Sequence, residues 1–265
     1  IALLRHQPAR RRVGTAPDPR IKPNEVLVKT GYAGICGTDL HIFRGEFHAR
    51  VKYPAIQGHE FGGVIEEVGA EVKSFKKGDR VVVDPIISCH ACPACQTGHL
   101  NACRTLKLLG VDLDGGFGQY VAAPANQVFH LPESVPMEYA PMVEMYGLGC
   151  HILLRGHVQP GETVAILGAG KLGLSILDVL CHSANACTTY VTDMQPFRLN
   201  TAAKLGADYT INIEKADPVA RIMELTDGVG VDCVIEAIGH FHEVKGQEAP
   251  LQQAVKMIRT GGRVV

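Results

Sequence analysis

The stretch GAGKLG at residues 168–173 decides the fold of the second half of this chain. It follows the apolar run Val164 to Leu167 and opens an amphipathic segment of helix length. In a strand–turn–helix unit of this kind the first glycine permits a tight turn. The second lets a pyrophosphate approach the backbone, and the third lets helix and strand pack closely. Backbone N–H groups and the helix dipole then face the phosphates. The motif alone is a weak signal, and a glycine-rich turn without a ligand is the alternative.

Strand-like and helix-like segments alternate from about residue 160 onward. The apolar strand-like runs are 163–167, 188–191, 209–213 and 231–235, and the amphipathic segments are 171–182, 196–205, 218–226 and 251–259. Regular alternation of this kind is typical of a parallel sheet wrapped by helices. We therefore expect an α/β half with a doubly wound parallel sheet over residues 151–265.

Asp193 strengthens the nucleotide interpretation because it ends the second expected strand, about 20 residues past the last glycine. A carboxylate there can bind the adenosine ribose hydroxyls and repel a 2′-phosphate, which favours NAD over NADP. An ordinary turn residue at a strand end is the alternative. The candidate cofactor-binding residues are Gly168, Gly170, Lys171, Leu172, Gly173, Asp193 and Arg198.

Residues 1–150 have a different texture, rich in Gly, Pro and Val and in short alternating runs. The runs at 25–29, 63–68 and 80–83 each end at turn residues, which predicts a mainly β region. We expect this β-rich half to form one domain, 1–150, and the α/β half to form the other, 151–265.

Composition and charge narrow the function classes. The 265 residues are 46% hydrophobic and 20% charged, with a net charge of −1. The one basic cluster, Arg10 to Arg12, is short and expected in a solvated loop, so nucleic acid is a poor partner. No apolar run reaches the roughly 18 residues that span a bilayer, and residues 1–6 lack the apolar stretch and small-residue cleavage site expected of a signal peptide. Nine cysteines then favour thiols or metal ligands in a reducing compartment. We expect a cytoplasmic protein with a small-molecule partner and no membrane association.

Four cysteines form the pattern C-x2-C-x2-C-x7-C: Cys89, Cys92, Cys95 and Cys103. Four thiolates in one loop can close a tetrahedral Zn2+ site, which leaves no position for a substrate. An iron–sulfur centre also uses four cysteines, but the bacterial ferredoxin run has a different final spacing. Reduced cysteines without a metal are the other alternative. The pattern predicts a structural zinc.

Two further stretches carry metal-ligating side chains: CGTDLH at residues 36–41 and GHEFGG at residues 58–63. One cysteine, one histidine and nearby carboxylates suit a zinc that keeps an open position. Each residue also has a simpler interpretation: Cys36 as a buried thiol, His59 as a core histidine and Glu60 as a surface charge. Spacing alone does not decide between the two.

Together these motifs resemble those of the zinc-containing medium-chain dehydrogenases, a family that includes alcohol, sorbitol and other polyol, and threonine dehydrogenases. Residues 58–60 with Gly63, Gly69 and Val72 match the family's zinc signature. The stretch at 36–41, the four-cysteine lobe and the glycine turn follow in the family's order and approximate spacing. The resemblance runs from about residue 24 to the end. It implies a GroES-like β catalytic domain followed by a Rossmann domain, in a homo-oligomer (dimer or tetramer).

The resemblance implies that Cys36 and His59 bind the catalytic zinc, with Glu60 as a direct or exchangeable ligand. Liver-type members place a cysteine at the fourth position, while sorbitol-type and secondary-alcohol enzymes place Glu or Asp there. In this chain Glu144 occupies that place. A surface carboxylate at a helix start is the alternative for Glu144. The implied cofactors are two zinc ions per subunit, one catalytic and one structural, and NAD.

Three residues beside these ligands also take roles from the resemblance. Asp39 would contact His59 and set its tautomer and orientation. Thr38 and His41 would form a proton relay. In the implied mechanism zinc lowers the pKa of the substrate hydroxyl, whose proton leaves through the relay while hydride passes to NAD+.

The chain departs from the family at both ends. It is shorter than the members, and residues 261–265 stand where the fifth strand of the nucleotide domain should begin. The start lacks the family's first hairpin strand. We therefore expect a Rossmann domain that is incomplete at its C-terminal end.

The resulting prediction is an oxidoreductase that transfers a hydride from a secondary alcohol or polyol to NAD+. Glu144 and the stretch HIFRGE at residues 41–46, which looks like the polyol branch, support it. L-Threonine 3-dehydrogenase is the nearest alternative. Outside the enzyme class, the alternative is a zinc-stabilised nucleotide-binding protein without turnover. The presence of Thr38 and His41 beside the ligands argues against it, because a purely structural protein has no use for a proton relay.

Overall fold

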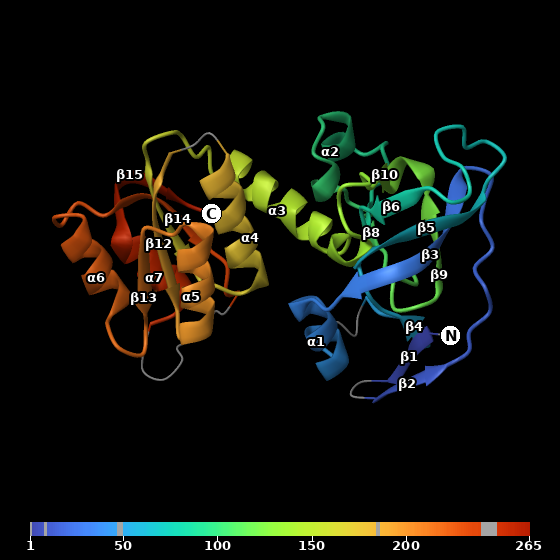
Figure 1. The fold of residues 1–265 in the computed structure, drawn as a ribbon, viewed down its shortest axis with the longest axis horizontal. Coiled ribbons are helices and arrows are strands. Elements are labelled where there is room, and N and C mark those ends of the chain that lie inside the picture. The colour runs from blue at the N-terminus through green and yellow to red at the C-terminus, as the bar shows by residue number, and fades with distance from the viewer. Residues whose placement is uncertain (1, 8–9, 47–49, 184–185, 240–247) are drawn as a thin grey trace. The chain divides into compact units, whose positions relative to one another are not determined.

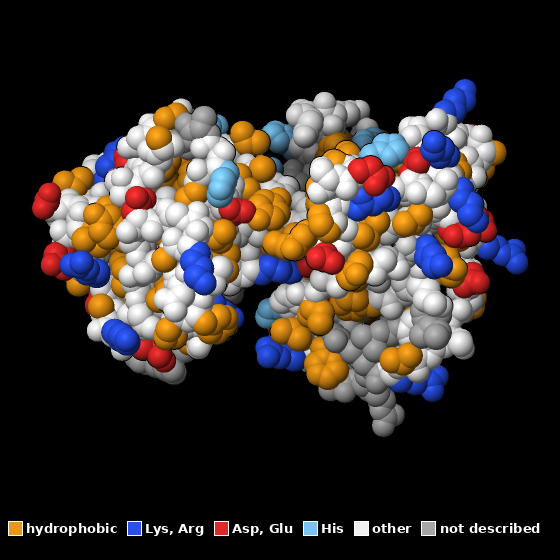
Figure 2. Space-filling model, viewed as in Figure 1, with side chains coloured by type: hydrophobic (Ala, Val, Ile, Leu, Met, Phe, Trp, Pro, Cys, Tyr) orange, Lys and Arg blue, Asp and Glu red, His pale blue; other side chains and the backbone are white. Residues whose placement is uncertain are grey.

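The computed structural model describes residues 2–7, 10–46, 50–183, 186–239 and 248–265. The chain divides into two compact units, Ile1–Glu144 and Met145–Val265. This division falls within helix α3 (Met142–Arg155), a few residues before the boundary expected from the sequence. Among the described residues, no helix has both the length and the apolar character needed to cross a membrane. Lys and Arg side chains are interspersed with Asp and Glu on the face shown in Figure 2.

The first unit is built on a five-stranded antiparallel sheet in the order β10-β6-β5-β3-β9. Its strands are β3 (Glu25–Gly34), β5 (Glu60–Val68), β6 (Arg80–Val83), β9 (Tyr120–Pro124) and β10 (Val128–His130). The expected runs at 25–29, 63–68 and 80–83 are confirmed as strands. Alternate side chains on them meet in one core, where Val26, Val28 and Ile65 are fully buried. Leu27, between Val26 and Val28, is also buried, so both faces of β3 are covered at this point of the sheet.

Smaller elements complete the first unit (Figure 1). They are β1 (Ala2–Gln7), β2 (Arg10–Gly14), β4 (Ala55–Ile56), β7 (Ile86–Ile87), β8 (Lys107–Leu108), α1 (Gly37–Arg44), α2 (Pro93–Gln96) and the short 3-10 turns Leu100–Ala102, Ala125–Gln127 and Met137–Tyr139. The pairing of β1 with β2 corrects two expectations. A hairpin is present at the start of the chain, and the arginines at 10–12 lie in its second strand, because pairing with β1 satisfies their backbone groups.

The second unit is a five-stranded parallel sheet in the order β13-β12-β11-β14-β15. The strands are β11 (Thr163–Leu167), β12 (Thr188–Asp193), β13 (Tyr209–Asn212), β14 (Val231–Glu236) and β15 (Ile258–Val264), and the helices are α4 (Lys171–His182), α5 (Pro196–Leu205), α6 (Pro218–Leu225) and α7 (Pro250–Met257). The chain winds outward from β11 in both directions, so the expected doubly wound sheet is confirmed.

Helices cover both faces of this sheet, as the side chains of β11 show. Val164 and Ile166 point into a core shared with α3, α4 and α5, whereas Ala165 and Leu167 point into a core shared with α6 and α7. In α4, Ile176, Leu177 and Leu180 are at most 1% exposed. Burying each of them contributes about 1.5–3 kcal/mol. This packing fixes the helix that follows the glycine turn.

The end of the chain differs from the expectation. Helix α7 stops at Met257, earlier than the helix expected to residue 259, and a fifth strand, β15, follows over Ile258–Val264. The reason lies in the residues: Thr260 and the two glycines after it are poor helix formers. Val264 lies opposite Val234 of β14 in parallel register. The fifth strand is therefore present, where the sequence suggested only its beginning.

Carboxylates hold the amino-terminal edge of the parallel sheet. Asp232 Oδ2 accepts hydrogen bonds from Thr163 N–H at 2.8 Å and from the Thr163 hydroxyl at 2.7 Å. Arg259 Nε donates to Asp232 Oδ1 at 2.5 Å. Burial by itself raises the pKa of Asp232, but the Thr163 and Arg259 donors outweigh it and lower the pKa from 3.8 to about 2. The charged form of Asp232 therefore ties β14 to β11 and to the start of β15.

Candidate active site and metal centres

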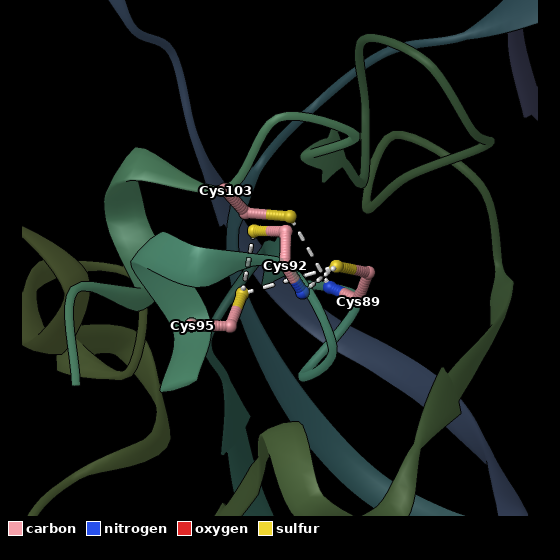
Figure 3. Close-up of side chains that lie close together, drawn as sticks. All are labelled: Cys89, Cys92, Cys95 and Cys103. Atoms are coloured by element: carbon pink, nitrogen blue, oxygen red, sulfur yellow. Dashed lines mark hydrogen bonds between the residues drawn. The ribbon is translucent and has the colours of Figure 1, made fainter. Parts of the chain in front are cut away.

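Four cysteine sulfurs converge in a lobe between β7 and β8 (Figure 3). The Sγ atoms of Cys89, Cys92, Cys95 and Cys103 all lie within 4.8 Å of one another. Cys89 Sγ is 3.9 Å and Cys92 Sγ 3.5 Å from Cys95 Sγ. In a tetrahedral zinc site with Zn–S bonds of about 2.3 Å, sulfurs stand about 3.8 Å apart. The spacing therefore fits a zinc ion in the centre.

Backbone N–H groups of the lobe donate hydrogen bonds to these sulfurs. Cys92 N–H donates to Cys89 Sγ, and Cys89 N–H donates to Cys103 Sγ, each at 3.3 Å. Backbone donors, first Ala91 and then Cys92, lower the pKa of Cys89 to about 6. Burial, in contrast, raises the pKa of Cys95 to about 12. Backbone donors, Arg104 first, lower the pKa of Cys92 as well, whereas the buried Cys95 needs a nearby cation to ionise.

A second cluster joins Cys36, His59 and Glu60, whose ligand atoms all lie within 4.8 Å of one another. Cys36 is the N-cap residue of α1, whereas Glu60 begins β5 and His59 directly precedes it. His59 and Glu60 are 6% and 1% exposed. Strand β3 ends just before Cys36 and pairs with β5, with Gly34 opposite Glu60. Sheet pairing therefore brings together two segments that are distant in sequence.

Two glycines make room for this cluster. Gly58 has φ +96°, a conformation that side chains rarely adopt, and it turns the chain into His59. At Gly34 an added Cβ would lie 2.4 Å from Glu60 Oε2. The carboxylate occupies the space that a larger residue at 34 would fill. Sequence reasoning missed Gly34, because only the pairing of β3 with β5 reveals it.

His59 provides the observation that tests whether a metal fits. Its Nδ1 is buried and has no hydrogen-bond partner among the described residues. A buried polar atom without a partner costs about 1–3 kcal/mol. Beside a thiol and a carboxylate, an imidazole with an unsatisfied nitrogen is the donor set that zinc prefers. The residues present therefore fit the zinc ion that this donor set requires.

Helix α1 carries the remaining candidates around Cys36. Asp39 is fully buried, and its Oδ2 accepts the Cys36 N–H at 2.9 Å, which caps the helix. Its expected contact with His59 stays a prediction. Thr38 Oγ1 lies 3.8 Å from Cys36 Sγ. His41 follows three residues later, so Thr38 and His41 share one face of the helix.

Glu144 lies in the first turn of α3 and is partly exposed. It is not among the three residues whose ligand atoms lie within 4.8 Å of one another. Its assignment to the catalytic metal stays a prediction.

The glycine turn of the second unit has the geometry that a phosphate cradle needs. Gly168 has φ +97°, and a Cβ at Gly173 would lie 1.8 Å from Gly168 O, so the turn and the close packing both require glycine. Gly170 is the N-cap of α4, and a Cβ there would meet no atom within 4 Å. The open side of the loop is therefore at Gly170, where the second glycine of such a motif faces a pyrophosphate.

Asp193 ends β12 and turns toward this loop. Its side chain is 6% exposed and accepts the Ala169 N–H at 2.9 Å and the Gln195 N–H at 2.8 Å. Arg198 Nη1 lies 3.5 Å from Asp193 Oδ2. Asp193 therefore holds the glycine turn in place and is itself flanked by a cation.

The chain matches two families of known domains. Residues 22–133 match the "Alcohol dehydrogenase GroES-like domain" and residues 172–265 match "Zinc-binding dehydrogenase". Sorbitol dehydrogenase of Bacillus subtilis (strain 168) is 37% identical over 266 residues, which cover 99% of this chain and 73% of that protein. L-Threonine 3-dehydrogenase of Pyrococcus abyssi (strain GE5 / Orsay) is 40% identical over 248 residues, covering 93% and 69%.

Solved structures of dehydrogenases are also similar to this chain. A zinc-binding dehydrogenase of Sinorhizobium meliloti 1021 bound to NADP has a TM-score of 0.90 at 33% identity, covering 99% of this chain and 75% of that one. An alcohol dehydrogenase of Escherichia coli CFT073 complexed with NADH has a TM-score of 0.89 at 36% identity, covering 99% and 74%. This chain therefore belongs to the family of zinc-dependent alcohol and polyol dehydrogenases. The expected GroES-like and Rossmann architecture is confirmed.

Proposed function

We propose that this protein oxidises a secondary alcohol or polyol with NAD+, at a zinc held by Cys36, His59 and Glu60. The observation that carries the proposal is the convergence of a thiol, an imidazole and a carboxylate within 4.8 Å, two of them almost fully buried. The Thr38 hydroxyl stands beside the same Cys36 sulfur. A purely structural zinc site has no need of a hydroxyl at that place.

When bound, zinc supplies Lewis acidity toward a substrate hydroxyl and NAD+ supplies the hydride acceptor. The side chains of the protein move the proton. The Thr38 hydroxyl both accepts and donates a hydrogen bond, so it can take the substrate proton while passing on its own. His41 lies on the same face of α1 and its side chain is 49% exposed, which suits the release of a proton to water.

We include Glu144 as the fourth protein group at this centre. A carboxylate donates less electron density to the zinc ion than a thiolate does. A zinc ion with such a ligand suits the binding of two adjacent hydroxyls of a polyol. Glu144→Ala is expected to weaken zinc retention at the Cys36 cluster and to leave the four-cysteine zinc in place. Glu138→Ala removes an exposed acid just ahead of α3 and serves as the matched control. Equal zinc retention in the two variants would remove Glu144 from the site.

A preference for NAD+ over NADP+ belongs to the same proposal. Asp193 supports it, because a buried carboxylate at the end of β12 repels the additional phosphate of NADP+. Arg198 at 3.5 Å is the counter-argument, since a guanidinium attracts that phosphate. We expect the repulsion by Asp193 to outweigh the attraction by Arg198, because two backbone N–H groups hold the Asp193 carboxylate in place.

The proposal also assigns two zinc ions to each chain, one in each cluster. The observation behind the second ion is the near-tetrahedral spacing of the sulfurs in the four-cysteine lobe. Elemental analysis of metal-replete protein is expected to give two zinc ions. One ion or none would contradict this assignment.

The substrate is tested with a panel of polyols, secondary alcohols and L-threonine, each with NAD+ and with NADP+. We expect the highest kcat/KM with a polyol and NAD+. L-Threonine 3-dehydrogenase is the second candidate, favoured by the 40% identity to the Pyrococcus abyssi enzyme. Fastest turnover of L-threonine would replace the first candidate by the second. No turnover of any member of the panel by protein holding two zinc ions would favour a nucleotide-binding protein without catalysis.

A further inference from the structure

A carboxylate contacts the last residue of the proposed proton relay. Glu46 Oε2 is hydrogen-bonded to His41 Nδ1. Each of the two side chains is 49% exposed, so the pair lies at the boundary between protein and water. Among the described residues, Glu46 is not part of the two clusters that could hold a metal ion.

The end of helix α1 creates this contact. Gly45 follows the helix in the left-handed region, with φ 91°. Its N–H donates to Ile42 O, and the Glu46 N–H donates to His41 O, each at 3.0 Å. A left-handed residue after a helix turns the chain back over the last turn. Glu46 is therefore held beside His41 by its backbone as well as by its side chain.

We infer that Glu46 is a positioning residue for His41: it accepts the Nδ1–H and so leaves Nε2 as the proton acceptor. A neutral imidazole has one N–H and one lone pair, and the partner of one nitrogen decides the state of the other. A carboxylate on Nδ1 selects the tautomer whose Nε2 carries the lone pair. The inference rests on the proposed function, because it needs His41 to receive the proton that Thr38 passes on.

Glu46 also affects the positive charge that forms on the His41 ring when the relay delivers a proton. The substrate O–H bond breaks, the proton reaches His41 Nε2, and the ring then carries a positive charge while Nδ1–H stays in place. The adjacent carboxylate stabilises that charge. Because both groups are half exposed, water screens the attraction and keeps it modest. The proton can therefore leave Nε2 for water and complete the transfer.

Nitrogen NMR of the histidine ring tests the tautomer without any turnover. The His41 signals of 15N-labelled protein are assigned by their loss in His41→Gln. In wild-type protein we expect the proton of His41 on Nδ1. Glu46→Gln keeps this state, since the amide oxygen still accepts the Nδ1–H, whereas Glu46→Ala loses it. Glu71→Gln removes an exposed acid in the turn after β5 and is the control.

Kinetics with sorbitol and NAD+ tests the consequence for the relay. We expect Glu46→Ala to lower kcat about tenfold with little change in KM, because the loss falls on proton transfer. Glu46→Gln is expected between Glu46→Ala and the wild type, and Glu71→Gln equal to the wild type. Glu46→Gln retains an oxygen that accepts the Nδ1–H but lacks the negative charge. This order of kcat values therefore separates the effect of the tautomer from the effect of the charge.

The two assays separate the failure of the inference from the failure of the proposed function. A wild-type ring with its proton on Nε2, or a tautomer unchanged in Glu46→Ala, overturns the inference whatever the turnover. Full turnover in His41→Gln, with the tautomer following Glu46 as expected, instead refutes the relay of the proposed function. A kcat that falls in His41→Gln but not in Glu46→Ala leaves the relay standing and removes Glu46 from it.

Discussion

A single methyl group at Gly34 is expected to displace the Glu60 carboxylate from the metal cluster. In Gly34→Ala the added Cβ would lie 2.4 Å from Glu60 Oε2 and 3.3 Å from Glu60 Cβ. Non-bonded heavy atoms settle about 3.5 Å apart, so the carboxylate has to retreat by about 1 Å. The ligand atoms of Cys36, His59 and Glu60 lie within 4.8 Å of one another, and a shift of that size takes Glu60 away from the other two or reorients it.

The effect on the metal is expected to exceed the effect on the fold. The overlapping oxygen ends a flexible side chain, so rotation relieves most of the clash, and we expect to lose about 1 kcal/mol of the free energy of unfolding. A misplaced ligand or ligand partner typically lowers metal affinity 10- to 100-fold. Zinc affinity of the Cys36 cluster should therefore fall by about that factor, while the four-cysteine lobe keeps its ion.

Gly37→Ala is the matched control, the same change three positions along the chain. Its Cβ would meet no atom within 4 Å, and it begins helix α1. We expect it to be neutral or stabilising by a few tenths of a kcal/mol. The assay is zinc release to a competing chelator, followed beside urea unfolding. Equal zinc affinity in the two variants and the wild type would show that Glu60 does not belong to the centre.

Three further predictions concern other parts of the chain. Asp232→Asn should lower the free energy of unfolding by about 2 kcal/mol at pH 7, because a fall in pKa from 3.8 to about 2 corresponds to that amount. The pKa of Asp232 in the folded protein lies below its ordinary value, so its contribution to stability is complete above about pH 4 and is lost as the pH falls toward 2. Urea unfolding should therefore show the difference in free energy of unfolding between variant and wild type closing over that range. A difference that stays constant with pH would contradict the assignment. Cys95→Ser should release the structural zinc and leave zinc at Cys36 and His59; elemental analysis that still gives two zinc ions would oppose this. Asp193→Asn keeps an oxygen for the Ala169 N–H but removes the charge, so the ratio of kcat/KM for NADP+ to that for NAD+ should rise. An unchanged ratio would mean that Asp193 does not select the cofactor.

Local patterns in the sequence are sufficient to predict most of the elements. The expected strands and helices of the second half correspond to β11–β14 and α4–α7, because apolar side chains recur there with the period of each element. The four cysteines are likewise close in sequence, so their spacing alone predicted a shared site. Where one segment contains all the determinants, sequence reasoning succeeds.

The features that sequence reasoning missed depend on partners elsewhere in the chain. Strand β15 gains its backbone hydrogen bonds from β14, and β1 pairs with the distant β4 as well as with β2. The closeness of Gly34 to Glu60 depends on the register between β3 and β5. The contact of Glu46 with His41 had a local signal, the glycine at position 45 after a helix. Cofactor preference, assembly into a dimer or tetramer and cytoplasmic location stay predictions.

The carboxylates at the two edges of the parallel sheet make different hydrogen bonds. At the amino ends of the strands, Asp208 accepts the N–H and hydroxyl of Thr189 and donates its own N–H back to that hydroxyl. Asp232 and Thr163 form the same reciprocal pair. These pairs join one strand to the next and leave little for a ligand to bind.

At the carboxyl ends the acids bind the backbone of loops instead. Asp193 accepts the Ala169 N–H of the glycine turn, and Glu236 accepts the N–H groups of Ile238 and Gly239. Each carboxylate there shapes a loop. Exchanging a strand-pairing acid such as Asp208 should therefore change stability and leave cofactor affinity alone, whereas exchanging Asp193 should change both. A difference of that kind would follow from geometry, because the described loops at the carboxyl edge contain N–H groups and open glycine backbone of the kind that binds a phosphate.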